Sequence, residues 1–506
     1  MADGDHLRRP AILLTVSLSL ALAFLAWNSS SIFPLVTIGN AQEISPAIAT
    51  GSAANAAKNV RPASASTPLS PSQFAHSVKR GESVTSLARM YLPQTSFMTV
   101  PELESAIRSN NGLAGRSLHP GQSIVIPGIE PQPVLEKSIP VPKDFEVRAI
   151  YLTGVMAGSA KGLRLINRWR QMGGNAVVFD IKDSDGILNV PFDHTLNSPA
   201  RRPVIRNLPK FARYLHSLGM HSIARIAIFR DERLVRSYPE LAVHSHRNGG
   251  PWRENGKLVW TDPSQPKVQQ FNIALASMVA NSGIDEVQFD YVRFPAEGDQ
   301  KDAQFVFQSE HPKWKRSDVI AAFLHDAYAE LRPKGVLLSL DVFGVMAWQR
   351  PVDLAHTGQD IPAMARFCDV LSPMIYPSHF FGMDGYAHPG DAPEHFIGES
   401  MERFMKVTAG TGVVLRPWLQ AFAWRTRSYS PAYIVTQVKV ARTRGGIGFL
   451  FWNARNDYSK PLLAMTEMRS HLFRGDEIPS ATSAKSASAA PVGAVPVSLN
   501  APKPAN

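Results

Sequence analysis

The strongest constraint on the fold is an alternation of strand-like and helix-like segments from about residue 145 to 472. Eight segments are rich in β-branched and aromatic residues, as expected of buried strands: Val147–Thr153, Asn175–Lys182, His221–Phe229, Glu286–Phe294, Val336–Phe343, Asp369–Tyr376, Val413–Gln420 and Gly446–Asn453. Seven amphipathic, helix-like stretches lie between and after them: Gly162–Met172, Leu208–Leu218, Gln265–Ala280, Asp318–Leu331, Glu394–Val407, Pro431–Thr443 and Lys460–Leu472. This pattern predicts an α/β fold, a (β/α)8 TIM barrel. An open doubly wound sheet is the alternative, but no glycine-rich phosphate loop follows the first strand.

Polar and apolar residues alternate along the predicted strands, and this indicates which side chains face the barrel interior. Apolar side chains should face the surrounding helices, so the polar set must point inward. In the fourth strand the inward set includes Glu286 and Asp290, and in the fifth it includes Asp341. Asp290 and Asp341 then lie at the carboxyl-terminal mouth, where barrel enzymes place their active sites. We expect Glu286, deeper in the barrel, to pair with Arg225 or Arg416.

Other polar and aromatic side chains are expected around the same mouth. Sugar rings have apolar faces that stack on Trp and Tyr, and their hydroxyls need polar partners, so this mixture favours a saccharide ligand. The predicted substrate-binding residues are Asp180, Lys182, Asp183, Arg293, Trp348, Tyr376, Trp418, Gln420 and Trp452. Trp424 lies just beyond a strand end in the same way.

Paired carboxylates at this position suit glycosidic cleavage. One carboxylic acid protonates the leaving oxygen, and a second carboxylate attacks the sugar or activates water. Asp290 and Asp341 lie on adjacent predicted strands, which suits a retaining pair about 5–5.5 Å apart, with Asp290 as nucleophile and Asp341 as acid and base. An inverting pair, about 6.5–9.5 Å apart, would instead combine Asp290 with Asp180 or Asp183. The sequence leaves both open.

Five segments of this region carry a family resemblance: VRAIYLTG (147–154), NAVVFDIKDSDG (175–186), GIDEVQFDYVRFP (283–295), LSLDVFG (338–344) and DVLSPMIYPSHF (369–380). In order and spacing the region resembles a bacterial family of glycoside-hydrolase barrels. The resemblance implies a barrel related to amylase-like and chitinase-like hydrolases, with Asp290 where amylase-type barrels carry their nucleophile. Those enzymes usually have a Glu acid on the fifth strand, where Asp341 stands here. The chitinase-like D-x-x-D-x-D-x-E strand is not reproduced.

A second ordered region, residues 74–128, has the predicted order strand, helix, helix, strand, which is typical of a small α+β unit. It opens with VKRGESVTSLA (78–88) and closes with LHPGQSIVIP (118–127). Both motifs resemble a LysM module. The resemblance implies binding to N-acetylglucosamine-containing glycans, usually peptidoglycan, through the loops after the first strand and before the last. The glycan-binding residues that it implies are Gly81, Glu82, Ser83, Val84, Leu118 and Pro120.

The two ends of the chain differ in character from the regions between them. Arg8 and Arg9 precede an apolar run from Ala11 to Trp27, which predicts a signal peptide or membrane anchor within residues 1–41. Residues 42–73 and 476–506 are rich in Ala, Ser and Pro, which predicts a disordered linker and a disordered tail. We therefore expect export to the periplasm or cell envelope, with anchoring in the inner membrane if the segment is not cleaved.

Charge and cysteine content narrow the function classes. The net charge of +11 suits an acidic glycan, an anionic membrane or nucleic acid. Nucleic acid is disfavoured because the sequence has no basic–aromatic ladder and the chain is expected to be exported. The single cysteine, Cys368, excludes an intrachain disulfide and disfavours a cysteine-based metal cluster. His244 and His246 lie in a polar loop, so no metal or cofactor is expected.

Two hypotheses follow from these observations. In the first, a LysM module holds the protein on peptidoglycan or another amino-sugar polysaccharide, and the barrel cleaves a glycosidic bond with Asp290 and Asp341. In the second, the barrel is a catalytically silent glycan-binding surface. The aspartate on the fifth strand, in place of a glutamate, favours the second hypothesis.

Overall fold

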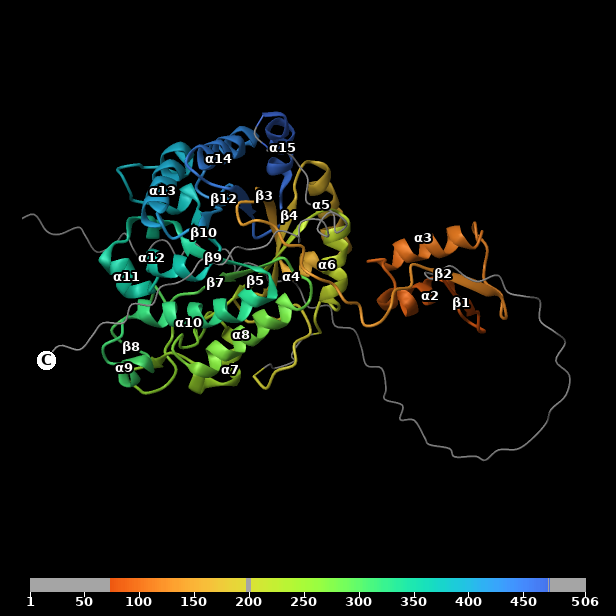
Figure 1. The fold of residues 1–506 in the computed structure, drawn as a ribbon, viewed down its shortest axis with the longest axis horizontal. Coiled ribbons are helices and arrows are strands. Elements are labelled where there is room, and N and C mark those ends of the chain that lie inside the picture. The colour runs from red at the N-terminus through yellow and green to blue at the C-terminus, as the bar shows by residue number, and fades with distance from the viewer. Residues whose placement is uncertain (1–72, 197–201, 472, 474–506) are drawn as a thin grey trace, which may run out of the picture. The chain divides into compact units, whose positions relative to one another are not determined.

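The computed structural model describes residues 73–196, 202–471 and 473 and divides into two compact units at Val134 (Figure 1). Each unit is described by itself. The predicted signal or anchor segment, the tail and all but the last residue of the predicted linker lie outside the described residues. Within the described ranges, every helix is too short or too polar to span a bilayer.

The first unit has the predicted order of elements. These are β1 (Gln73–Ser77), α2 (Val84–Tyr91), α3 (Val100–Asn110) and β2 (Ser123–Pro127). The two strands pair antiparallel, with Phe74 opposite Ile126. Capping boxes at Ser83 and Thr99 start the two helices. The helices and β2 enclose a small apolar core that includes Leu87, Leu103, Ile107, Ile124 and Ile126.

The second unit is a closed barrel of parallel strands, as predicted. Its strands are β3 (Val147–Leu152), β4 (Ala176–Lys182), β5 (His221–Ala227), β7 (Glu286–Asp290), β9 (Leu337–Phe343), β10 (Val370–Ile375), β11 (Val414–Leu415), β12 (Trp418–Gln420) and β13 (Gly448–Trp452). They pair in chain order, except that β11 and β12 both pair with β10, and β13 returns to β3. Strands β11 and β12 are two halves of the predicted seventh strand, separated at Arg416 and Pro417, where proline lacks the N–H that a ladder needs.

Helices surround the strands in Figure 1, and all seven predicted helices are present. They are α5 (Ala160–Gln171), α6 (Leu208–Ser217), α8 (Pro266–Ala280), α10 (Arg316–Leu331), α13 (Pro393–Val407), α14 (Pro431–Thr443) and α15 (Ser459–His471). Between β9 and β10 the chain forms two short α-helices, α11 (Pro351–Thr357) and α12 (Ile361–Met364), and two 3-10 turns. Gly358 ends α11 with a left-handed φ of 70°, so no long helical pattern exists there to be recognised.

The loops after β5 and β7 are long and joined to one another. The first contains α7 (Glu232–Ser237) and β6 (His244–Ser245), and the second contains β8 (Ala303–Gln304) and α9 (Phe307–Glu310). Strands β6 and β8 pair antiparallel. Trp252 of the first loop packs on Gly298 of the second, where a Cβ atom would lie 2.7 Å from the indole ring. The two loops therefore form one structure above this side of the barrel.

Candidate active site

A buried ion pair occupies the lower part of the barrel interior. Arg416 Nη1 donates to both carboxylate oxygens of Glu286, at 2.9 and 2.7 Å, and His221 Nε2 lies 3.1 Å from the same carboxylate. Burial raises the pKa of Glu286, but Arg416 and His221 outweigh it and lower the pKa to about 2. The predicted pairing of Glu286 with Arg416 is confirmed. Because both side chains are fully buried, this pair is structural.

Above this pair, Arg225 binds two carboxylates at the ends of neighbouring strands. Its Nε and Nη2 donate to Asp290 Oδ2 at 3.1 and 2.6 Å, and its Nη1 donates to Asp180 Oδ1 at 2.5 Å. The hydroxyl of Tyr151 donates to the other oxygen of Asp180, at 2.5 Å. Asp180 and Asp290 therefore face the barrel interior, as the alternation predicts.

Asp341 faces the same cluster from β9. Trp418 Nε1 donates to its Oδ1 at 2.6 Å, and its Oδ2 lies 3.8 Å from Arg225 Nε. Burial and then the charge of Asp290 raise the pKa of Asp341 well above its ordinary value, which favours the protonated acid. Since Asp290 Oδ2 and Asp341 Oδ2 both lie within 4 Å of Arg225 Nε, they are no more than about 7 Å apart.

The backbone is strained directly after Asp290. Tyr291 has a φ of 52°, in the left-handed region that a bulky residue rarely adopts, and its N–H donates to Asp290 Oδ1 at 2.6 Å. Strand β7 therefore ends at Asp290, and the prediction that it continues to Phe294 is wrong. The turn fixes the orientation of the carboxylate.

Aromatic rings surround the carboxylates. Trp452 stacks on Tyr151 with centroids 6.3 Å apart and lies 5.9 Å from Tyr376. Burial, Asp341 and Asp290 all raise the pKa of Tyr376, which places its hydroxyl in the field of both carboxylates. Trp452 is partly exposed, whereas Tyr151, Tyr376 and Trp418 are buried. Trp452 is therefore the ring of this group that is most open to a sugar.

Asp183 lies beyond the end of β4 and titrates near neutrality. Its Oδ1 accepts hydrogen bonds from the backbone N–H groups of Asp185 and Ile187, both at 3.0 Å. Burial and then the charges of Asp180 and Asp185 raise its pKa to about 7. The Asp183 carboxyl therefore stabilises the local turn, and it is also a titratable group beside the mouth.

The inward position predicted for Lys182 is wrong. The register of β4 against β5 shifts between Asp180 and Lys182, which reverses the alternation for the last residue of the strand. The Lys182 ammonium is fully buried, 3.0 Å from Asp231 Oδ2 and 2.8 Å from Asn272 Oδ1 of α8. It therefore holds α8 and the loop after β5 to the outside of the barrel and does not reach a ligand.

Two further predicted substrate residues have structural contacts instead. Gln420 accepts a hydrogen bond from the Ser378 N–H, and its amide donates to the Phe422 carbonyl and the Thr426 hydroxyl, so it braces the loops after β10 and β12. Trp348 lies 5.8 Å from the ring of Phe380 and 4.9 Å from the Arg403 guanidinium of α13. The structure does not bring Trp348 to the carboxylates.

Arg293 is buried in an aromatic cage beside the site. Its guanidinium lies 4.7 Å from the ring of Trp260 and 4.4 Å from that of Phe343. Two glutamates of the joined loops, Glu254 and Glu297, are buried nearby, and burial and then Glu254 raise the pKa of Glu297 to about 7. The positive charge of Arg293 therefore compensates the charges of these loop carboxylates, and its side chain packs within the wall of the mouth. Sequence reasoning missed both glutamates because loops have no periodicity.

Sequence reasoning placed Arg225 inside the barrel but missed Tyr151. In β3 the face that carries Tyr151 also carries the apolar Val147 and Ala149, while the charged Arg148 lies on the other face, so the polar-inward rule points to the wrong face. The hydroxyl at Tyr151 was the remaining clue, because a buried Tyr hydroxyl needs a partner. Within the described ranges, no group of three or more His, Cys, Asp or Glu side chains is arranged to hold a metal ion.

In the first unit, the structure accounts for several of the predicted glycan-binding residues locally. Val84, predicted to bind glycan, is only 2% exposed and packs in the core, so its side chain is not open to a ligand. Ser83 caps α2, and Glu82 accepts a hydrogen bond from the Lys79 N–H and lies 2.7 Å from His76 Nε2. The exposed or partly exposed turn residues Gly81, Leu118 and Pro120 stay predictions.

Comparison with known proteins agrees with this architecture. Residues 149–458 match the family model described as "Putative glycosyl hydrolase domain", and residues 76–127 match the LysM domain. Among curated protein sequences, nothing matches the chain.

Solved structures similar to the chain include a hypothetical protein from Ruminiclostridium thermocellum ATCC 27405, with 33% identity, 38% of this chain and 97% of that chain covered, and a TM-score of 0.32. The PgaB (BpsB) glycoside hydrolase domain from Bordetella bronchiseptica is 16% identical over 63% of this chain and 98% of that chain, with a TM-score of 0.46. The spore cortex-lytic enzyme SleL from Bacillus megaterium QM B1551 is 11% identical over 80% of this chain and 87% of that chain, with a TM-score of 0.40.

The barrel match spans more than half of the chain, and the LysM match falls on the first compact unit. The chain therefore belongs to the family of the "Putative glycosyl hydrolase domain" and carries a LysM domain before its barrel in the sequence.

Proposed function

We propose that this protein hydrolyses a glycosidic bond in an amino-sugar polysaccharide of the cell envelope, with Asp290 as nucleophile and Asp341 as general acid and base. One observation carries the proposal. The two aspartates share the guanidinium of Arg225, but Asp290 forms the closer ion pair while burial favours the protonated form of Asp341. Two carboxyl groups held in different protonation states are what acid-assisted attack requires.

In the first step, Asp341 gives its proton to the leaving glycosidic oxygen while an oxygen of Asp290 attacks the anomeric carbon. Trp418 donates to Oδ1 of Asp341, which leaves Oδ2 to carry that proton. In the second step, Asp341 is ionised and takes a proton from water, and the resulting hydroxide equivalent displaces Asp290 from the sugar. The separation of no more than about 7 Å suits the retaining spacing and only the narrow end of the inverting spacing.

Arg225 and Tyr291 orient the nucleophile. Arg225 donates to Oδ2 of Asp290 and the Tyr291 N–H donates to Oδ1, so the plane of the carboxylate is fixed before substrate arrives. When Asp290 becomes an ester, Arg225 keeps the charge of Asp180 as its partner. The guanidinium therefore stays compensated through the cycle.

The LysM domain supplies attachment to the polymer. A module that binds N-acetylglucosamine-containing chains holds the barrel near the same chains and raises the effective substrate concentration. This assigns the protein to the periplasm or cell envelope, with a membrane attachment through the N-terminal segment if that segment is retained. We expect peptidoglycan or a related amino-sugar polymer as substrate and no cofactor.

A second candidate function, glycan binding without hydrolysis, is favoured by the low exposure of the two carboxyl groups. Asp290 is 6% and Asp341 is 1% exposed, and Arg225 lies against both. In this case the charged network only holds the barrel strands together, and the rim binds the glycan.

Release of new reducing ends from soluble peptidoglycan glycan strands tests the proposal. We expect the wild-type chain to release them, Asp290→Asn to abolish release, and Asp341→Asn to slow it by about 10²–10⁴-fold. Asp193→Asn, an exposed site outside the cluster, is the matched control and should retain full activity. Full activity in Asp290→Asn contradicts the mechanism. Binding of the strands by the wild-type chain without new reducing ends supports the second candidate.

A further inference from the structure

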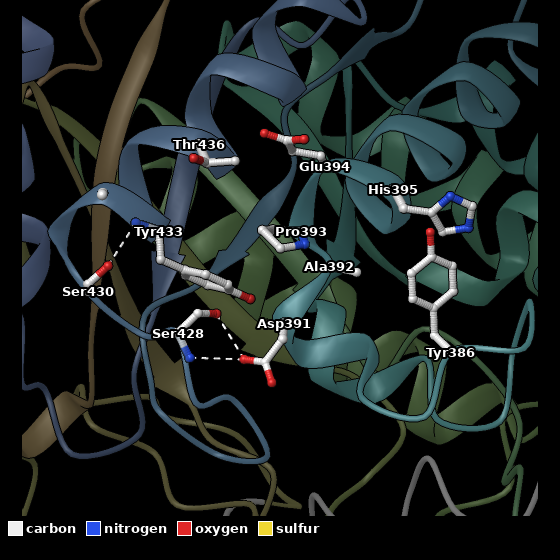
Figure 2. Close-up of a pocket in the computed structure, with 11 residues that line it drawn as sticks. Tyr386, Asp391, Ala392, Pro393, Glu394, His395, Ser428, Ser430, Tyr433 and Thr436 are labelled. Atoms are coloured by element: carbon white, nitrogen blue, oxygen red, sulfur yellow. Dashed lines mark hydrogen bonds between the residues drawn. The ribbon is translucent and has the colours of Figure 1, made fainter.

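A pocket of about 470 Å³ lies between the loops that follow β10 and β12, where α13 and α14 begin (Figure 2). Loops that follow barrel strands lie on the carboxyl-terminal face, which is also the face of Asp290 and Asp341. In Figure 2, Tyr386 and His395 lie on one side of this pocket, and Ser428 and Ser430 lie on the other. Neither the predicted substrate residues nor the proposed mechanism uses it.

One side of the pocket is a rigid aromatic platform. Tyr386 is 40% exposed, yet its ring stacks on His395 with centroids 4.7 Å apart and an interplanar angle of 28°. The ring also meets the edge of Phe396 at 5.3 Å, and His395 Nε2 lies 2.9 Å from Asp384 Oδ2. An exposed ring that its neighbours hold in place loses little entropy when an apolar sugar face stacks on it.

The other side offers hydrogen-bonding groups with fixed directions. Asp391 Oδ1 accepts from the backbone N–H of Arg427 at 2.7 Å and from the N–H and hydroxyl of Ser428, both at 2.9 Å. These three bonds orient the carboxylate and leave its second oxygen as an acceptor. Ser430 accepts from the Tyr433 N–H at the start of α14, so its own O–H proton remains available as a donor.

The charge of the pocket narrows the class of ligand. Its lining includes the carboxylates of Asp391 and Glu394 and no Lys or Arg. A uronic acid or phosphorylated sugar would meet like charge there, whereas a neutral or amino sugar would not. The volume is within the range of about 300–1,000 Å³ that is typical of small-ligand pockets.

Ring contacts connect the pocket's loops with the carboxylates. His379 lies 5.3 Å from Tyr376, which is in the field of both aspartates, and 5.1 Å from Trp424 in the loop after β12. The loop after β12 packs on the loop after β10 at Gly390, where a Cβ atom would lie 2.2 Å from the Arg425 carbonyl oxygen. Trp424 itself is partly exposed.

We propose that this pocket is a saccharide subsite remote from the cleaved bond, which takes one or two sugar units of an N-acetylglucosamine-containing chain. The identity of the sugar rests on the proposed function, but the subsite does not depend on which carboxyl groups act. Because its lining residues are not those that contact Asp290 or Asp341, such a subsite would hold sugar units other than the two joined by the cleaved bond.

Hydrogen exchange on the full chain, measured by mass spectrometry, tests the subsite because each peptide reports separately. The chain carries Asp290→Asn so that the probe, an N-acetylglucosamine hexamer, is not consumed. We expect the hexamer to protect peptides that cover residues 384–395 and 426–436. Tyr386→Ala should weaken this protection about tenfold in hexamer concentration, because the stacking area is lost. Tyr386→Phe keeps the ring and should behave as the parent chain does.

Peptides from the LysM domain show in the same samples that the hexamer is bound there at saturation. Absence of protection at the pocket under that condition overturns the subsite, as does equal protection in Tyr386→Ala. Protection by a galacturonic acid hexamer contradicts the assigned sugar class. Failure of the wild-type chain to release reducing ends would refute hydrolysis alone, because protection at the pocket does not require cleavage.

Discussion

Replacing Glu286 by Gln tests how much of the barrel's stability depends on its buried ion pair. The substitution keeps the shape of the side chain and removes its charge, so Arg416 loses the carboxylate to which its Nη1 donates twice. Among the described residues, Nε and Nη2 of Arg416 have no hydrogen-bond partner, so the guanidinium has no second acceptor to turn to.

Two estimates of the cost agree. The pKa of Glu286 falls from 4.5 to about 2, and at about 1.4 kcal/mol per unit this corresponds to about 3 kcal/mol. Removing one partner of a buried pair generally costs about 3–5 kcal/mol. Both side chains are 0% exposed, so solvent screening does not reduce the estimate. We therefore expect Glu286→Gln to lower the free energy of unfolding by about 3 kcal/mol at pH 7.

The assay is denaturant unfolding followed by tryptophan fluorescence, which reports on the barrel because residues 73–134 contain no tryptophan. The folded-state pKa is depressed, so the pair's contribution is fully present above about pH 4.5 and is lost as pH falls towards 2. The difference between wild type and variant should shrink over that interval. A loss below about 1 kcal/mol at pH 7, or a difference that stays constant down to pH 3, refutes the reasoning. Glu286→Leu combined with Arg416→Leu removes both charges and should cost less than the single change.

Two further predictions concern the mouth. Asp183→Asn should raise the free energy of unfolding at pH 8 by about 2 kcal/mol and leave it unchanged at pH 3.5 in denaturant titrations. The reason is that a pKa raised to about 7 penalises the folded, ionised state only above about pH 3.8. The figure of about 2 kcal/mol is half of the full linkage value, because the residue is partly exposed. Equal effects at both pH values would contradict this. Trp418→Phe removes the hydrogen bond that lowers the pKa of Asp341, so the basic limb of the profile of kcat/KM against pH should move to higher pH. An unmoved limb would show that Asp341 is not the acid.

Strand alternation located the two central aspartates because polar and apolar residues differ clearly along β7 and β9. Glu286 and Asp290 lie four positions apart and so share one face of β7, while Val287 and Phe289 occupy the other face. The same rule failed at Lys182, because a change of register near the end of β4 is set by the neighbouring strand and leaves no mark in the sequence.

Loop residues were harder to place than strand residues. Glu254 and Glu297 come from different loops, which are joined by the two-residue pairing of β6 with β8 and by the packing of Trp252 on Gly298. Gln420 was placed on the correct strand and face, yet its amide is used by the loops above it, which no periodicity describes. Composition and spacing therefore predict the frame of the site, and tertiary contacts decide which of its polar groups remain free.

The short ladder between β6 and β8 also limits how this protein can evolve. A deletion in the loop after β5 or in the loop after β7 would separate Trp252 from Gly298. It would also expose Arg293, which lies three positions after Asp290. Length changes in the two segments should therefore occur together across related proteins.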